Sequence, residues 1–177
     1  VGPPPAFLVF REAKVDWALT EVGPGGRLDA TNVIPAARVT AITRVAFDHM
    51  AELGDTLASI AEEKAGIIKA GTTLVLGKLH PDARAVIEAR AAELGVRIVP
   101  LGSPEPIPGM PLAYPRVAMI GSNLAVAVTI ASELGIPAKT VAQGIEATVW
   151  PGRNELLHRN GRDFTLLEAE RRKCAFL

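Results

Sequence analysis

The sequence predicts an α/β fold, with a mostly parallel sheet flanked by helices. Two observations support this prediction. Short runs rich in Val, Ile and Thr alternate along the chain with longer segments of helical periodicity, which is the order of parallel strands joined by helical crossovers. The 177 residues are 49% hydrophobic but only 5% aromatic. We therefore expect an aliphatic, alanine-rich core, which a chain of this length can bury.

Six short segments have the composition of strands. The first ends at a carboxylate and the second is rich in β-branched side chains, which favour a pleated surface. The others are short apolar runs bounded by Gly, Pro or charged residues. Strands are predicted at residues 15–21, 38–47, 72–77, 96–99, 116–120 and 164–167.

Four longer segments have the pattern of helices. Asp55 or Thr56 can cap the first and Gly66 can end it, whereas Gly95 closes the second. A Gly-Ile-Pro break separates the last two. Helices are predicted at residues 55–64, 82–94, 124–134 and 138–147. Residues 102–115 hold five prolines and two glycines, which indicates an irregular segment.

Composition narrows the functional class. Lys plus Arg and Asp plus Glu number 19 each, so net charge gives no reason to expect nucleic acid or an anionic membrane as a partner. The single cysteine, Cys174, excludes an internal disulfide and fits a reducing, cytoplasmic compartment. No apolar run reaches the roughly 20 residues of a membrane span. The chain starts without Met or the features of a signal peptide, so we interpret it as cut from a longer protein or as an incomplete gene model.

Two polar side chains follow the first two predicted strands. Glu21 ends the first and His49 follows the second. Ligands of parallel α/β sheets bind beyond the carboxyl ends of the strands, so both side chains would face one crevice if the strands are neighbours. A carboxylate and an imidazole can hold a divalent ion such as Mg2+, with waters and phosphate oxygens. Alternatively, Glu21 is a solvated rim residue and His49 a hydrogen-bonded structural group.

Lys64 lies on the apolar side of its predicted helix. It shares a face with Leu57, Ile60 and Ala61 by the spacing of helical turns. It could point into the site beside the metal. Its stem could equally pack while the ammonium reaches solvent, and spacing does not separate the two interpretations.

Three further features carry weaker signals. The glycines of residues 23–26 are spaced loosely like a phosphate loop, but no Lys-Ser or Lys-Thr follows them, and a tight turn with positive φ is the simpler interpretation. Asn123 precedes an alanine-rich helix and is by default its N-cap. Arg153 follows Pro-Gly and could grip a phosphate, although most lone loop arginines do not.

These residues lie in motifs that resemble folylpolyglutamate synthase/dihydrofolate synthase, of the Mur ligase family. Residues 21–32 read Glu-Val-Gly-Pro-Gly-Gly-Arg-Leu-Asp-Ala-Thr-Asn, similar to a signature of the folate enzymes, with Pro24 in place of an apolar residue. Similar blocks follow in the family's order at Phe47-Asp48-His49, Leu53-Gly54-Asp55-Thr56, Lys64-Ala65-Gly66-Ile67, Lys69 and Pro151-Gly152-Arg153-Asn154-Glu155. The resemblance covers roughly residues 6–155.

The resemblance implies an ADP-forming ligase. Such enzymes use Mg-ATP to phosphorylate a folate or dihydropteroate carboxylate, and the amine of L-glutamate then attacks the acyl phosphate. By this resemblance Glu21 and His49 match Mg2+ ligands, and Lys64 matches a lysine that carbon dioxide carbamylates. Asn123 matches an asparagine that contacts the adenine of ATP, and Arg153 an arginine that contacts its phosphate.

The resemblance also implies missing parts. Residues 1–150 are expected to form a partial Mur-ligase-like central domain, and residues 151–177 a linker and the truncated start of the C-terminal domain. The family's P-loop would lie upstream, and a family block with His and Asn is absent after Arg153. We therefore expect an inactive portion of a ligase. The alternative is a non-catalytic remnant without an enzymatic role.

Overall fold

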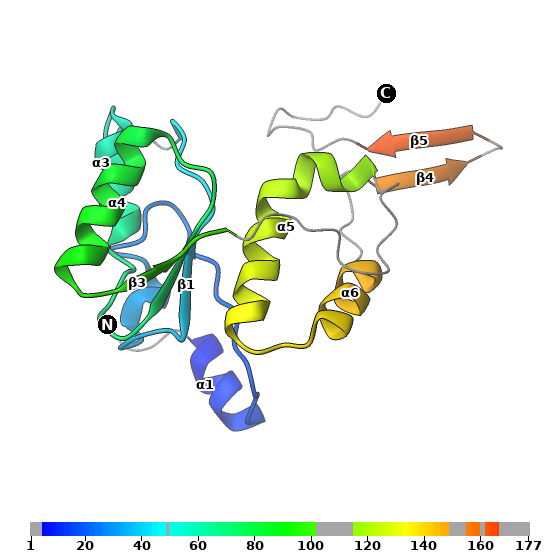
Figure 1. Ribbon diagram of the computed structural model, residues 1–177, viewed down its shortest axis with the longest axis horizontal. Coiled ribbons are helices and arrows are strands. Elements are labelled where there is room, and N and C mark those ends of the chain that lie inside the picture. Colours follow the sequence, from blue (N-terminus) through cyan, green and yellow to red (C-terminus); the bar gives the residue numbers. More distant parts are fainter. Residues whose placement is uncertain (1–4, 49, 102–114, 149–154, 160–161, 167–177) are drawn as a thin grey trace.

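The computed structural model describes residues 5–48, 50–101, 115–148, 155–159 and 162–166 (Figure 1). It contains a three-stranded sheet in the order β1-β2-β3, with both pairs of strands parallel. The strands are β1 (Val39–Ile42), β2 (Thr73–Leu76) and β3 (Arg97–Val99).

Helices cover both faces of this sheet. Side chains alternate along β2 between the two faces: Leu74 and Leu76 belong to one core cluster, with Ile60 and Ile87, and Val75 packs into another. The first cluster brings in α3 (Leu57–Ala65) and α4 (Pro81–Glu93), and the second brings in α5 (Pro115–Glu133) through Val126. Both clusters are aliphatic, as the composition predicts.

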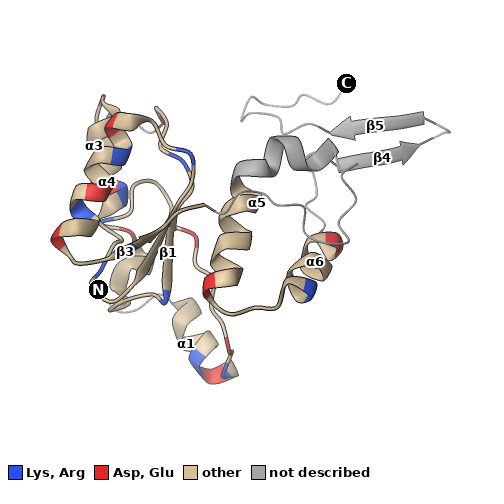
Figure 2. Ribbon diagram, viewed as in Figure 1, with Lys and Arg blue, Asp and Glu red and all other residues tan. Residues whose placement is uncertain are grey.

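The remaining elements lie around these layers. An antiparallel hairpin forms a second, two-stranded sheet. These elements are α1 (Pro5–Ala13), the 3-10 helix η1 (Ala30–Val33), α2 (Met50–Leu53), α6 (Ala138–Ala147), β4 (Glu155–Arg159) and β5 (Arg162–Leu166). Figure 2 shows acidic and basic residues interspersed along α4 rather than segregated by sign.

Most of the predicted elements are confirmed. The strands expected at residues 38–47, 72–77 and 96–99 form β1, β2 and β3, and the helices expected at 55–64 and 82–94 form α3 and α4. The helix at 138–147 and the strand at 164–167 correspond to α6 and β5. Thr56, not Asp55, is the N-cap of α3, because its hydroxyl accepts the Ser59 N–H.

Two predicted strands are wrong. Residues 15–21 are exposed and pair with no described strand, and a strand without a ladder partner leaves its backbone polar groups to water. Residues 116–120 lie inside α5, which begins at Pro115 and runs unbroken to Glu133. Short apolar runs fit strand and buried helix equally well, and Pro favours the first helical position. Asn123 is consequently in the middle of α5 and is not an N-cap.

Some predictions fall on other parts of the chain. Outside the described residues lie positions 102–114 of the segment predicted as irregular, the domain division after residue 150, His49, Arg153 and Cys174. The domain division stays a prediction. Within the described residues, none of the helices combines the length and hydropathy required to cross a bilayer.

Gly77, just after β2, packs closely against the backbone that follows β1. Its N–H donates to the Ile42 carbonyl at 2.9 Å, and a Cβ at this position would lie 2.8 Å from the Thr43 carbonyl carbon. We expect Gly77→Ala to lower the free energy of unfolding by about 1–3 kcal/mol, the usual cost of overpacking.

Gly144 in α6 is the matched control, because a Cβ there meets nothing within 4 Å. Gly144→Ala should raise stability by about 0.5–1 kcal/mol, since alanine is the better helix former. Urea denaturation of both variants measures the difference. Equal stability of the Gly77 variant and the parent would contradict the packing described for this junction.

Candidate functional site

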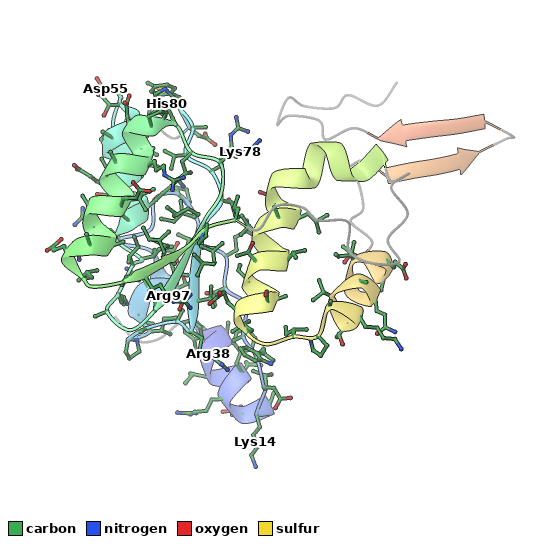
Figure 3. The ribbon with its side chains drawn as sticks, in the orientation of Figure 1. Lys14, Arg38, Asp55, Lys78, His80 and Arg97 are labelled. Carbon is green, nitrogen blue, oxygen red and sulfur yellow. The ribbon has the colours of Figure 1, made fainter. Side chains whose placement is uncertain are left out.

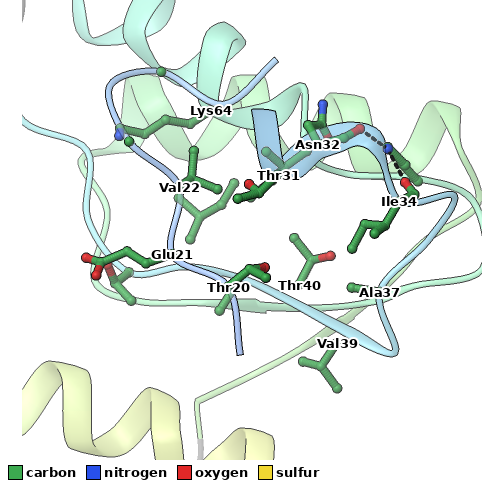
Figure 4. A pocket seen from close by; sticks show the side chains of 17 residues that line it. Thr20, Glu21, Val22, Thr31, Asn32, Ile34, Ala37, Val39, Thr40 and Lys64 are labelled. Carbon is green, nitrogen blue, oxygen red and sulfur yellow. Dashed lines mark hydrogen bonds between the residues drawn. The ribbon is translucent and has the colours of Figure 1, made fainter. Parts of the chain in front are cut away.

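A cavity of about 450 Å³ lies between β1, the glycine-rich segment (residues 23–34) and the carboxyl-terminal end of α3 (Figure 4). A second cavity of about 510 Å³ adjoins the glycine-rich segment. Glu21 and Lys64 line both cavities. The first cavity also presents the polar residues Thr20, Thr31, Asn32, Thr40, Thr43 and Lys69.

Lys64 reaches the cavities because α3 is fixed at its start and buried along one side. The Thr56 and Ser59 side chains form a capping box at its N-terminus, which satisfies backbone donors that the helix leaves free. Ile60 and Ala61 are buried. Lys64 follows on the same side and is half-buried. Lys64 lines both cavities, which is one of the two orientations that the spacing left open.

The glycine-rich segment is attached to the end of α3 by backbone contacts that require glycine. A Cβ on Gly26 would lie 2.9 Å from the Glu63 carbonyl oxygen and 3.2 Å from the Lys64 Cα. A Cβ on Gly66 would lie 2.6 Å from the Arg27 Cα. Gly66 ends α3 as predicted, but its φ of −61° is ordinary. Space for Arg27, rather than backbone freedom, is the reason for glycine at this position.

Arg27 adds polar contacts to this attachment. Its N–H donates to the Glu63 carbonyl at 2.9 Å, and its guanidinium donates to the Glu63 carboxylate at 2.8 and 3.1 Å. The hydrogen bond and the charge of Glu63 raise the pKa of Arg27 above its ordinary value. The Asn32 amide donates to the carbonyls of Arg27, at 3.0 Å, and Gly66, at 3.1 Å, which satisfies an acceptor at the helix end.

Asp29 organises the segment internally. Its carboxylate accepts the Gly23 N–H at 3.0 Å and the Thr31 N–H at 2.8 Å, together with the Thr31 hydroxyl. The Thr31 hydroxyl, and then the two backbone N–H groups, lower the pKa of Asp29. Gly25 makes the intervening turn at a φ of +85°, as predicted for a tight turn. A carboxylate thus links the segment next to Glu21 to η1.

The segment before Glu21 is held by an aromatic contact. The Arg38 guanidinium carbon lies 5.2 Å from the centroid of the Trp17 ring, which is within the range of a cation–π interaction. Arg38 immediately precedes β1. The contact keeps residues 17–21 near the start of β1, although they form no strand.

The structure brings together some of the predicted site residues and not others. Glu21 and Lys64 share both cavities. Asn123 is exposed on α5 and lines neither cavity. Sequence reasoning missed Lys69 and the Arg27–Glu63 pair as parts of the site. Arg27 and Lys69 lie in motifs that resemble those of the family. The local sequence does not reveal their contacts, because their partners are backbone atoms or a residue 36 positions away.

The donor chemistry of the cavities fits a magnesium ion shared with phosphate. Glu21 is the acidic residue that lines the first cavity, and Asp48 joins it at the second. Among the described residues, no group of three or more His, Cys, Asp or Glu is close enough to hold a metal ion alone. Mg2+ usually takes one or two protein carboxylates and completes its shell with waters and substrate phosphates.

Comparisons with known proteins identify the family. No family model matches the chain. It is 36% identical over 175 residues to the folylpolyglutamate synthase of Lacticaseibacillus casei, covering 84% of this chain and 41% of that protein. It is 33% identical over 182 residues to the dihydrofolate synthase/folylpolyglutamate synthase of Bacillus subtilis, covering 88% of this chain and 42% of that protein.

A solved complex of folylpolyglutamate synthase with AMPPCP and folate superposes with a TM-score of 0.74 at 32% identity, covering 86% of this chain and 43% of that chain. The chain belongs to the folylpolyglutamate synthase/dihydrofolate synthase family. The predicted Mur-ligase-like fold is thereby confirmed, as is the predicted family. This family member spans about two fifths of the length of the relatives it matches.

The lowered pKa of Asp29 predicts a pH-dependent contribution to stability. Because the folded state favours the charged carboxylate, its stabilisation should be complete above the unfolded pKa of about 3.9 and should disappear as the pH falls through the lower folded pKa. We expect Asp29→Asn to be less stable than the parent at pH 7, and the difference to shrink near pH 3. Urea denaturation at the two pH values provides the measurement.

The exposed Asp16 supplies the control, and Asp16→Asn should change stability little at either pH. A loss in the Asp29 variant that is the same at both pH values would show that charge is not what this carboxylate contributes.

Proposed function

We propose that the chain forms part of an ATP-dependent ligase that adds L-glutamate to dihydropteroate or folate. The observation that carries this proposal is the convergence of Glu21 and Lys64 on the same cavities, within motifs that resemble those of the family. The relatives' names and the complex with AMPPCP, an analogue of ATP, and folate support the nucleotide and the acceptor. The single cysteine supports a cytoplasmic location.

The proposed reaction has two steps. An acceptor carboxylate oxygen attacks the γ-phosphorus of ATP, which forms an acyl phosphate and releases ADP. The amine of L-glutamate then attacks the acyl carbon, forms the amide, loses a proton and releases phosphate. Mg2+ would neutralise negative charge on the phosphates in the first step. Glu21 and His49 are the residues we assign to hold it.

Lys64 has a role in this proposal that its charge alone would not allow. An ammonium near Mg2+ would repel it. The ammonium first loses a proton. Addition of carbon dioxide to the resulting neutral amine forms a nitrogen–carbon bond and releases a second proton, which leaves an anionic carbamate. The carbamate could then orient the metal or its waters. No hydrogen bond or ion pair of the Lys64 ammonium is recorded among the described residues, so its nitrogen is available for this modification.

Asn123 and Arg153 would act on the nucleotide. We assign Asn123 to the adenine and Arg153 to phosphate oxygens, for which a guanidinium is a suitable donor. We also propose that the 177-residue chain alone does not catalyse this reaction. It includes no Gly-rich loop ending in Lys-Ser or Lys-Thr, which would hold the terminal phosphates of ATP.

A chimera tests this proposal. The matching segment of the L. casei enzyme is replaced by this chain, and ADP release is measured with Mg-ATP, folate and L-glutamate. We expect ADP release that depends on both folate and glutamate in the chimera, and none above background from the 177-residue chain. Turnover by the chain alone would overturn its proposed inactivity. A chimera that folds and unfolds like its parent but releases no ADP would favour the non-catalytic remnant.

Lys64→Ala in the chimera tests the assigned role of the lysine. We expect ADP release to fall by about 100-fold or more, the usual scale when a group that stabilises transition-state charge is removed. Lys78→Ala is the matched control, since Lys78 is exposed and extends from the surface (Figure 3). Near-normal turnover of the Lys64 variant would make the carbamate assignment wrong.

A further inference from the structure

The two lysines that line the first cavity have different surroundings. The Lys69 ammonium donates to the backbone carbonyl of Asn32 at 2.7 Å and also to that of Ile34 (Figure 4). No such contact of the Lys64 ammonium is recorded among the described residues. Both side chains are half-buried. Proximity to the cavity therefore does not give the two lysines the same role.

The donors of Lys69 are largely committed to the protein. An ammonium has three N–H donors, and two of those on Lys69 are used on carbonyl oxygens. Hydrogen bonds from an ionised donor are stronger than neutral ones. A ligand phosphate could use the third donor alone and would have to displace these bonds to recruit the other two. Lys69 thus fits a role in holding the chain better than a role in binding a ligand.

The residues that Lys69 contacts are connected to Glu21 through η1 and a hydrogen bond of Asp29. Asn32 lies in η1, whose N-cap is Asp29, and the Asp29 carboxylate accepts the N–H of Gly23. Gly23 is two residues from Glu21. On the other side, Lys69 follows the end of α3 by four residues, and Lys64 lies in the last turn of that helix. Lys69 therefore joins the segment carrying Glu21 to the segment carrying Lys64.

We propose that Lys69 is a positioning residue that keeps Glu21 and Lys64 facing the same cavity. It acts by fixing the carbonyls of Asn32 and Ile34, and through η1 and Asp29 it fixes the segment before Gly25. Lys69 itself touches no reacting atom. The functional importance of this role rests on the proposed function, but the positional effect does not.

Hydrogen exchange of the 177-residue chain tests the first part. Lys69→Met keeps the aliphatic length and removes the donors, and Lys78→Met is the matched control. We expect exchange of the amides of residues 21–34 to become about tenfold faster in the Lys69 variant, because local opening no longer breaks two charge-assisted bonds. Amides of β2 should keep the parent rate, and the control should match the parent throughout.

The NMR signal of the Lys64 ε-methylene group tests the second part, since loop anchoring alone would not move it. We expect it to shift in Lys69→Met while the signal of the exposed Lys139 stays in place, and to return toward its parent position in Lys69→Arg, which keeps charge and donors. If the Met variant does not fold, the exchange and NMR measurements on Lys69→Gln decide the question in the same way.

Three outcomes would overturn the proposal. Amide exchange of residues 21–34 could stay at the parent rate, or exchange in β2 could accelerate equally. Exchange of residues 21–34 could also accelerate while the Lys64 signal does not shift. Faster loop exchange with a shifted Lys64 signal would support it, even if the folded chimera releases no ADP. In that case the proposed function would fail while the positioning role would stand.

Discussion

The close approach of the glycine-rich segment to the end of α3 is the constraint on which the site depends. Gly26 and Gly66 lie where any Cβ would meet backbone atoms of Glu63 or Arg27. The two segments are 36 to 40 residues apart in the chain, so their contact orders a large loop at a cost in chain entropy. Backbone hydrogen bonds and an ion pair between Arg27 and Glu63 offset part of that cost.

Polar side chains satisfy backbone groups of the glycine-rich segment at this contact. Residues 23–34 contribute no strand, so side chains satisfy some of their backbone groups: the Asp29 carboxylate accepts the Gly23 N–H, and the Asn32 amide and the Lys69 ammonium donate to carbonyls. Within the described part of the chain, no buried side-chain nitrogen or oxygen lacks a hydrogen-bond partner. Because these groups are occupied in holding the segment, Glu21 and Lys64 are left to face the cavities. The same arrangement separates the lysine that positions from the lysine that is available for chemistry.

The sequence predicts much of the fold because its layers follow simple periodicities. β1, β2 and β3 are β-branched or aliphatic runs, and α3 has a clear cap and a buried stripe, so spacing alone predicted that Lys64 could face inward. The segment at 15–21 has the same apolar pattern, but pattern says nothing about whether a ladder partner exists. Pro115 opens α5 and the apolar run after it is helical, which a local pattern does not distinguish from a strand. Lys69 could not be predicted as a positioning residue, because its partners are carbonyls of a loop whose path only the folded chain defines.

The most direct test of this account is the distance between the glycine-rich segment and α3 in solution. Gly26 packs on the last turn of α3, where a Cβ added to it would lie 3.2 Å from the Lys64 Cα. An NMR experiment should therefore show a strong nuclear Overhauser effect between the α protons of Gly26 and Lys64. A folded chain with the expected effects between neighbouring β strands but none between Gly26 and Lys64 would contradict the account, because nothing would then hold Glu21 and Lys64 at one cavity.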